Sequence, residues 1–187
     1  TLPRASKMDK IVLASGNQGK INEFAHLFEQ YHIRIVAQGE LGVQDVPETG
    51  TTFVENAIIK ARHAAKVTGL PALSDDSGLV VDALDGAPGI YSSRYSETTP
   101  GADDATDAGN IDALLAALSD VAAPQRTAHF MCVLVFMRHH ADPTPIICQG
   151  QWHGKIATQR AGEQGFGYDP VFYCPTLNKH AAECEKS

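Results

Sequence analysis

The sequence lacks four features that would place it in a specialised class of protein. No apolar run approaches the roughly 20 residues that a membrane-spanning helix requires. No stretch is of low complexity, and no internal repeat is present. The chain also lacks an excess of basic residues: its formal net charge is −7, whereas polynucleotide-binding proteins normally carry a basic surface. We therefore expect no membrane and no polynucleotide partner, while a single nucleotide would need a local cluster of amides, lysines and a metal ion.

The cysteines form no recognisable metal or disulfide pattern. They are Cys132, Cys148, Cys174 and Cys184, and their spacing contains neither a C-x-x-C pair nor a zinc motif. We expect reduced, mostly buried thiols in a cytoplasmic protein. The N-terminus shows no signal-peptide pattern, and because Met8 directly precedes the first strand-like segment, we expect residues 1–7 to be an expression remnant.

The opening of the chain indicates the fold class. It predicts a strand (Lys10–Ser15), a glycine-containing turn (Gly16–Gly19), a helix from near Lys20 and a second strand (Ile33–Ala37). No linker marks a domain boundary, and 187 residues suffice to bury a core without disulfides. We therefore expect one catalytic domain over residues 1–187, of the α/β class, with a mixed sheet surrounded by helices.

The remaining elements follow from helix caps and hydrophobic periodicity. Thr52-Phe-Val-Glu55 has the form of a capping box and opens a predicted helix that ends near Thr68, before Gly69. Apolar residues at helical spacing predict another helix over Thr106–Leu118. Strands are predicted over four further segments: Gly78–Asp82, His129–Arg138, Pro145–Trp152 and Gly154–Thr158.

The segment Ser15-Gly-Asn-Gln-Gly-Lys20 is a candidate phosphate-binding loop. It leaves a strand and enters a helix, so its backbone N–H groups point at whatever lies beyond the helix N-terminus. Its two glycines allow the dihedral angles of an anion-holding nest, and its lysine adds charge. The segment is too short to be a P-loop. The alternative is an ordinary strand-to-helix turn with an exposed lysine.

Carboxylates gather at two places. Asp75-Asp76-Ser77-Gly78 follows a short apolar segment where a strand is expected to end, and Glu48 comes just before the capped helix. Mg²⁺ takes one or two carboxylates together with waters and substrate phosphates. Because adjacent strand residues point to opposite faces, we expect one aspartate to face the metal and the other to support the loop or reach the metal through water. A polar turn without a metal is the alternative.

Three further segments carry side chains that suit a nucleotide. Lys60 lies one helical turn after Asn56 and is a candidate phosphate ligand, or else part of a solvated helix face. Arg94 is a second candidate for the phosphates, or else a partner in a surface ion pair. Phe166-Gly-Tyr-Asp169 offers a ring that can stack on a base and a carboxylate that can accept N–H groups from a purine edge, unless the ring is simply a core residue.

The order of these segments is more specific than any one of them. Five motifs follow one another: Ser-Gly-Asn-x-Gly-Lys from Ser15, Glu-Thr-Gly-x-Thr-Phe-x-Glu-Asn-Ala from Glu48, Ser-Asp-Asp-Ser-Gly from Ser74, Gly-Ala-Pro-Gly-Ile-Tyr-Ser from Gly86, and Gly-Phe-Gly-Tyr-Asp-Pro from Gly165. In these motifs the chain resembles the inosine/xanthosine triphosphate pyrophosphatase family, in its bacterial dITP/XTP branch. The resemblance extends from about Lys10 to Glu183.

This resemblance implies a two-lobed homodimer with the active-site cleft between the lobes. The implied activity is hydrolysis of aberrant purine nucleoside triphosphates (ITP, dITP, XTP) to the monophosphate and pyrophosphate, which cleanses the nucleotide pool. Mg²⁺ is the implied cofactor with Glu48 and Asp76 as ligands, and Asp76 also activates the attacking water with Asp75 beside it. Substrate contacts are implied for Ser15, Gly16, Asn17, Gln18, Gly19, Lys20, Lys60, Ser77, Arg94, Phe166, Gly167, Tyr168 and Asp169.

The C-terminal end departs from the family pattern. The family continues with a lysine, a Ser-His-Arg segment and a closing helix, and the histidine and arginine help to read the 6-oxo edge of the base. This sequence ends at Cys184-Glu-Lys-Ser187, where Lys186 is the candidate for the family lysine at a shorter spacing. This departure leaves open a purine nucleotide-binding protein without turnover. A separate alternative, independent of the C-terminus, is a related pyrophosphatase acting on other modified nucleotides.

Overall fold

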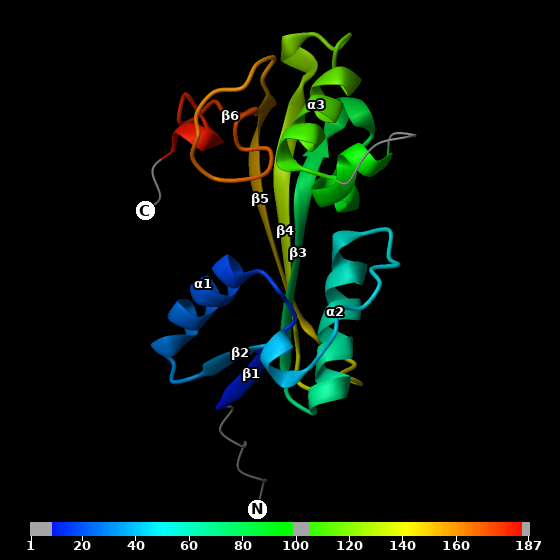
Figure 1. Cartoon of the computed structure of the whole chain (residues 1–187), viewed down its shortest axis with the longest axis vertical. Coiled ribbons are helices and arrows are strands. Elements are labelled where there is room, and N and C mark those ends of the chain that lie inside the picture. The colour runs from blue at the N-terminus through cyan, green and yellow to red at the C-terminus, as the bar shows by residue number, and fades with distance from the viewer. Residues whose placement is uncertain (1–8, 99–104, 185–187) are drawn as a thin grey trace, which may run out of the picture. The chain divides into compact units, whose positions relative to one another are not determined.

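The computed structural model describes residues 9–98 and 105–184 of the chain (Figure 1). These residues form two compact units, each assembled from two separate stretches of sequence. Unit 1 consists of the residues up to Asp76 together with Val133–Gln149. Unit 2 consists of Ser77–Cys132 and the residues from Gly150 onward.

Unit 1 is built on parallel strands. The strand β1 (Lys10–Leu13) lies between β2 (Arg34–Ala37) and the first part of β3 (Ala72–Val81), and it pairs in parallel with both. After Lys10, β1 is entirely apolar and buried, as expected of a central parallel strand that is covered on both faces.

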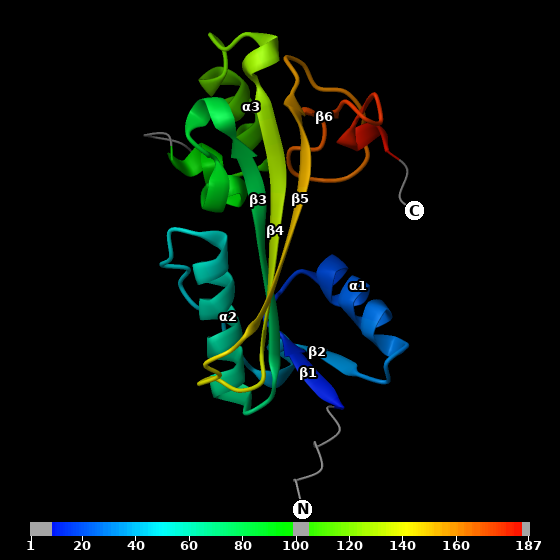
Figure 2. The ribbon, with the colours of Figure 1, turned by 180° about the vertical axis from the view of Figure 1, so that it is seen from behind.

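Two helices cover these strands. The helices α1 (Gln18–Glu29) and α2 (Phe53–Thr68) lie on opposite sides of β1 and β2 in both views (Figures 1 and 2). α1 packs large apolar side chains against the strands, namely Ile21, Phe24 and Phe28. α2 instead buries alanines, namely Ala57, Ala61, Ala64 and Ala65. Because alanine side chains are small, the backbone of α2 approaches the sheet closely, which brings Lys60 of this helix near β3.

The core of unit 2 forms around α3 (Asp107–Ala117). The helix is capped by the Thr106 hydroxyl, which accepts a hydrogen bond from the Gly109 amide. Before α3, the segment η3 (Gly89–Thr98) has 3₁₀ character with a break at Arg94. The core residues are Leu79, Val81, Ile111, Leu114, Leu118, Ala128, Ile156, Tyr168, Val171, Phe172 and Ala181.

The longer strands contribute to both units. Like β3, the strands β4 (Thr127–Met137) and β5 (Ile146–Ile156) have residues in each unit. In unit 2, β5 pairs in antiparallel fashion with β6 (Phe172–Cys174), which pairs likewise with β7 (Lys179–His180). The strands of the described residues are hydrogen-bonded in the order β2-β1-β3-β4-β5-β6-β7, which confirms the predicted mixed α/β sheet.

Four short 3₁₀ helices, none of them predicted, complete the described structure. They are η1 (Gln38–Leu41), η2 (Asp82–Leu84), η4 (Ala123–Gln125) and η5 (Ala181–Glu183). Such segments span about one turn, so they carry no hydrophobic period that a sequence pattern would show.

Several predicted boundaries need correction. The helix expected near Lys20 begins at Gln18, because Asn17 caps it. The strand expected to end before Asp75 continues, so Asp75–Gly78 is part of β3 and forms no turn. The two strands expected on either side of His153 are one strand, β5. Gly154 does not interrupt β5; it lets β6 approach, since a Cβ at this position would lie 2.5 Å from the Tyr173 carbonyl oxygen.

The cysteines also differ from expectation. Cys174 is buried, but Cys132 and Cys148 are exposed and Cys184 is half-buried, so the prediction of mostly buried thiols is wrong. Across residues 9–98 and 105–184, no helix combines the length and the apolar character that a membrane crossing requires.

The connection between β4 and β5 is held by a carboxylate in unit 1. The Asp142 carboxylate accepts hydrogen bonds from the amides of Arg138 and Thr144, each at 3.0 Å, and forms an ion pair with the Arg138 guanidinium at 2.6 Å. Hydrogen bonding from Arg138 holds the pKa of Asp142 well below its usual range. An ionised Asp142 therefore fixes the turn.

We expect Asp142→Asn to lower the melting temperature at neutral pH. The difference in melting temperature between the variant and the wild type should become smaller as the pH falls. A depressed pKa in the folded state gives stability above the unfolded-state pKa, about 3.9, and this stability is lost as the pH falls through the folded-state pKa. Thermal unfolding of both proteins from pH 7 downward measures the difference, with Asp120→Asn, an exposed acid, as control. A difference that stays constant in acid would contradict this account.

Candidate active site

Two adjacent aspartates in the middle of β3 organise the candidate site in unit 1. Asp75 forms an ion pair with Lys20 of α1, whereas Asp76 forms one with Lys60 of α2. Because α1 and α2 lie on opposite sides of the strands, the two carboxylates point to opposite faces, as the alternation of strand side chains predicts. A polar turn at this position, the alternative interpretation, is excluded by the continuous strand.

Asp75 fixes the start of α1. Its side chain is only 6% exposed, and its Oδ2 lies 2.5 Å from Lys20 Nζ. The Asn17 side chain accepts a hydrogen bond from the Lys20 amide at 3.1 Å, and the Ser15 hydroxyl accepts one from the Asn17 amide at 3.1 Å. Lys20 is thus held at the helix N-terminus by both its backbone and its ammonium group.

The N-terminus of α1 is the part of this loop that is suited to an anion. The first-turn amides of Gln18 and Gly19 precede the first intrahelical hydrogen bonds, so they point out of the helix. The predicted nest is not formed, because neither Gly16 nor Gly19 has a positive φ. The backbone at Gly16 faces open space, since a Cβ there would meet nothing within 4 Å, so the described residues leave room for a side chain at this position.

Glu48 is placed by the loop that precedes α2. The buried Asn56 side chain accepts a hydrogen bond from the Gly50 amide at 2.8 Å. A Cβ on Gly50 would lie 2.7 Å from that same Asn56 oxygen, so glycine is required for this approach. The Glu55 carboxylate accepts hydrogen bonds from the Thr51 amide and from the Thr51 and Thr52 hydroxyls, which ties the loop to the helix a second time.

A buried hydrogen bond connects α2 to β3 next to the aspartates. The Ser74 hydroxyl donates to the Ala57 carbonyl at 2.5 Å, and Ser74 is fully buried. The helix that positions Glu48 and the strand that carries Asp76 are therefore locked together. Sequence reasoning missed both Ser74 and the clamp formed by Asn56; a polar residue at a predicted buried position was the available signal in each case.

Lys60 connects the two candidate metal ligands. Its ammonium nitrogen lies 3.1 Å from Glu48 Oε1 and 3.4 Å from Asp76 Oδ1. Burial by itself would lower the pKa of Lys60, but the charges of Asp76 and Glu48 outweigh it, so the pKa of Lys60 is raised. Lys60 is therefore protonated and shared by two carboxylates, and the alternative of a solvated helix face is excluded.

The environment of Asp76 fits a cation. Burial raises the pKa of Asp76, with the Lys60 charge opposing the shift and the Glu48 charge adding to it. Its Oδ2 is buried and has no hydrogen-bond partner within the described residues. A divalent cation would supply that partner, and Glu48 would supply a second carboxylate. Within residues 9–98 and 105–184, no group of three or more Asp, Glu, His or Cys side chains is placed to hold a metal.

In unit 2, η3 carries Arg94. The Arg94 guanidinium lies over the Tyr91 ring, 5.1 Å from the ring centroid, so it makes a cation–π contact; the predicted alternative was a surface ion pair. The buried Ser92 hydroxyl fixes the start of this segment by accepting from the Leu79 amide at 2.8 Å. Ser77, another candidate, is exposed on β3.

The segment Phe166–Asp169 divides into an exposed and a buried half. The Phe166 ring is 78% exposed, which excludes a core role. Tyr168 is instead the buried ring of the segment, and its hydroxyl donates to the Ser92 carbonyl at 2.7 Å. Burial raises the pKa of Asp169, whose carboxylate accepts a hydrogen bond from the Phe166 amide at 3.0 Å. Of the two rings, only Phe166 is therefore available to a base.

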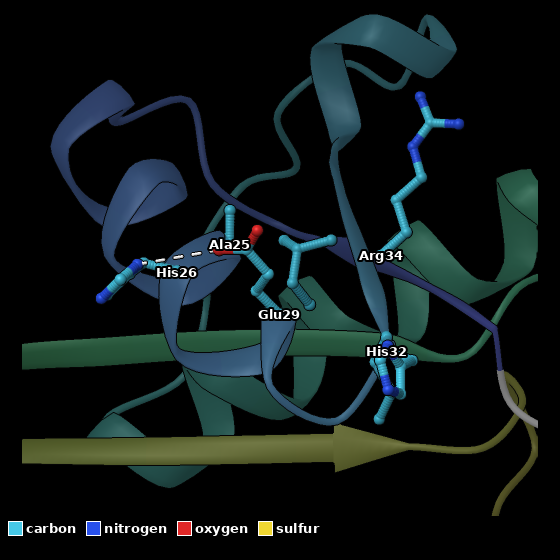
Figure 3. Close-up of a pocket in the computed structure, with 7 residues that line it drawn as sticks. Ala25, His26, Glu29, His32 and Arg34 are labelled. Carbon is cyan, nitrogen blue, oxygen red and sulfur yellow. Dashed lines mark ion pairs between the residues drawn. The ribbon is translucent and has the colours of Figure 1, made fainter.

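A surface depression in unit 1 lies apart from the candidate residues. It is lined by α1 and by residues around β2, namely Ala25, His26, Glu29, His32, Ile33, Arg34 and Ile35 (Figure 3). His26 and Glu29 are only 3.9 Å apart but are both largely exposed, and the Arg34 side chain extends away from His26. No candidate site residue lines this depression. The remaining candidate, Lys186, lies outside the described residues.

Comparison with known proteins places the chain in a family. The model of the Ham1 family matches residues 11–187. A protein of Yersinia pseudotuberculosis named dITP/XTP pyrophosphatase is 60% identical over 94% of this chain and 87% of its own length. The protein of the same name from Escherichia coli O157:H7 is 58% identical over the same shares of the two chains.

Solved structures that resemble this chain carry the same family name as the matching family model. A HAM1 protein from Coxiella burnetii has a TM-score of 0.89 and 50% identity, covering 95% of this chain and 88% of its own. The Ham1 protein of Staphylococcus aureus has a TM-score of 0.84 and 42% identity, covering 95% and 87%. The chain therefore belongs to the Ham1 family, the triphosphate pyrophosphatase family that its motifs resemble.

Proposed function

We propose that this chain is a magnesium-dependent pyrophosphatase that hydrolyses dITP, XTP and ITP to the nucleoside monophosphate and pyrophosphate. The observation that carries the proposal is the arrangement of Glu48 and Asp76 around a single ammonium group, that of Lys60. The names of the relatives support the reaction class and two of the three substrates. ITP is included because it shares its base with dITP.

The triphosphate is assigned to residues of unit 1. The first-turn amides of Gln18 and Gly19 and the ammonium of Lys20 provide positive charge at the N-terminus of α1. Lys60 provides a second cation. Phosphoryl and nucleotidyl transfer requires mainly alignment and charge neutralisation, and fixed amides and lysines supply both.

Mg²⁺ would be held by Glu48 and Asp76. When bound, it supplies positive charge to the phosphate oxygens. Asp76 would accept the proton of the water that attacks the α-phosphorus, after which the bond to the β-phosphate oxygen breaks and pyrophosphate leaves. Oδ1 of Asp76 faces Lys60, which leaves the buried Oδ2, without a partner among the described residues, for the cation.

The base is assigned to residues of unit 2. The exposed Phe166 ring offers a stacking surface, and the Asp169 carboxylate offers an acceptor. Hypoxanthine and xanthine carry an N1–H donor, whereas adenine carries an acceptor at N1. When ATP is bound, a carboxylate facing this position would meet the N1 acceptor of adenine, so that neither acceptor has a donor, and such mismatches discriminate strongly. Guanine also carries N1–H, so rejection of GTP must depend on its 2-amino group.

The proposal includes a homodimer in the cytoplasm, where the nucleotide pool is used. The dimer and the cytoplasmic location are both expected from the family resemblance, and the names of the relatives state neither. Light scattering tests the first: a mass of about twice the 20.0 kDa of one chain supports the dimer, and a mass of one chain overturns it.

The activity itself is tested by release of pyrophosphate from dITP, XTP, ITP, GTP and ATP, each with Mg²⁺ and with EDTA. We expect turnover of the first three with Mg²⁺ and none with EDTA, because the phosphates need a divalent cation. Binding of dITP without turnover would instead indicate a nucleotide-binding protein. Equal turnover of all five nucleotides would contradict the assignment of the base to Phe166 and Asp169.

Asp76→Asn separates catalysis from binding. We expect kcat to fall by about 10²- to 10⁴-fold, because the amide cannot accept the proton of the water. Nucleotide affinity, measured by calorimetry, should change much less. Glu40→Gln, which alters an exposed carboxylate outside the candidate site, is the control. A loss of affinity as large as the loss of kcat would argue against Asp76 as the proton acceptor.

A further inference from the structure

Two carboxylates hold two successive amides at the exposed turn of unit 2. The Phe166 amide donates to Asp169 Oδ2 at 3.0 Å, and the Gly167 amide donates to Asp107 Oδ2 at 2.9 Å. Asp169 belongs to the same turn, whereas Asp107 comes from α3, 60 residues earlier in the chain. Of these two hydrogen bonds, the one between the Gly167 amide and Asp107 connects the turn to a separate element of the fold, α3.

The backbone of this turn depends on glycine. Gly165 and Gly167 have φ angles of +80° and +59°, in the left-handed region. A Cβ on Gly165 would lie 2.0 Å from Asp169 Oδ2, so the carboxylate fills the space beside the backbone. A glycine-rich turn has many accessible conformations. Its hydrogen bonds therefore decide which conformation the turn adopts, and with it where the exposed Phe166 ring lies.

The same helix fixes the segment that carries Arg94. The Asn110 side chain accepts from the Ser96 amide at 2.8 Å and donates to the Ser93 carbonyl at 3.0 Å. Asp107 and Asn110 are one helical turn apart on α3. The first turns of α3 therefore anchor both substrate-binding candidates of unit 2, the Phe166 turn through Asp107 and the Arg94 segment through Asn110.

We propose that Asp107 is a positioning residue for base recognition, which acts by holding the Phe166–Gly167 turn through the Gly167 amide. This inference rests on the proposed function, in which Phe166 meets the base. Asp107 needs no contact with the nucleotide for this role. Removing its acceptor frees the turn, and the nucleotide must then order it again on binding, which weakens binding of the base while the phosphate-binding residues of unit 1 are unaffected.

The experiment compares Asp107→Ala with Asp107→Asn. The asparagine keeps an oxygen acceptor for the Gly167 amide but removes the charge. We expect Asp107→Ala to raise KM for dITP by about ten-fold with kcat within about two-fold of wild type, which is the size expected for the loss of one charged acceptor. Asp107→Asn should restore KM to within about three-fold of wild type.

A competitor without a base separates positioning from general damage. The inhibition constant of tripolyphosphate should be unchanged in Asp107→Ala, because tripolyphosphate uses only the phosphate-binding residues. The control is Asp112→Ala. Asp112 lies on the same helix, α3, and pairs with Arg160, so this substitution removes an acid from α3 without touching the Phe166–Gly167 turn. Two results would overturn the proposal. The first is an equal increase in KM for dITP and in the inhibition constant of tripolyphosphate; the second is an Asp107→Asn variant that behaves like Asp107→Ala. Both results indicate that α3 is destabilised by loss of the negative charge in its first turn.

Amide hydrogen exchange distinguishes failure of this inference from failure of the proposed function. Absence of pyrophosphate release by the wild type from any nucleotide would refute the function without involving Asp107. Exchange at the Gly167 amide, followed by NMR, reports on the hydrogen bond directly. We expect faster exchange in Asp107→Ala and near-normal exchange in Asp107→Asn; equal exchange rates in wild type and Asp107→Ala would refute the role of Asp107 in either case.

Discussion

The candidate site depends on one ammonium group shared by two carboxylates. Lys60 lies within salt-bridge distance of both Glu48 and Asp76, which come from a loop and a strand. Removing either carboxylate would leave a partly buried charge with less compensation, and removing the lysine would leave two acids to repel each other. The three side chains therefore constrain one another, and the elements that carry them must be fixed to within a fraction of an ångström.

The helix α2 is fixed against the strands by the small and polar side chains that it buries. Its alanine row allows close approach to the strands, and the hydrogen bond from Ser74 to the Ala57 carbonyl locks the helix to β3 beside Asp76. Directly before Ala57, Asn56 holds the loop that carries Glu48. A buried serine or asparagine costs free energy unless it is hydrogen-bonded. Ser74 Oγ and Asn56 Oδ1 are both bonded, whereas Asn56 Nδ2 has no partner within the described residues.

The sequence predicts the elements better than the connections between them. The limits of α2 follow from Thr52 and Gly69, because caps are local signals. The continuity of β3 through Asp75 and Asp76 did not follow, since two acids resemble a turn until their partners Lys20 and Lys60 are known. Those partners lie on helices from distant parts of the sequence.

The candidate site shows the same division. Motif order selected Glu48, Lys60 and Asp76, all of which the structure brings together. It did not reveal Ser74 or Asp107, whose roles depend on backbone groups 17 and 60 residues away. A residue that binds a distant backbone amide or carbonyl leaves no periodic pattern and no characteristic spacing, so only the folded chain identifies it.

One local arrangement nevertheless occurs in both units. α2 and α3 both begin with a threonine cap, Thr52 and Thr106, with closely similar backbone angles (φ −130° and −128°, ψ 157° in each). Four residues after each cap, a buried asparagine, Asn56 or Asn110, binds the backbone of the segment that carries a candidate substrate or metal ligand. The threonine satisfies the helix end locally, which frees the asparagine to bind outside the helix. In this chain Thr-x-x-x-Asn therefore occurs at the start of two helices whose asparagine holds such a segment, and the fold identifies which backbone groups each asparagine binds.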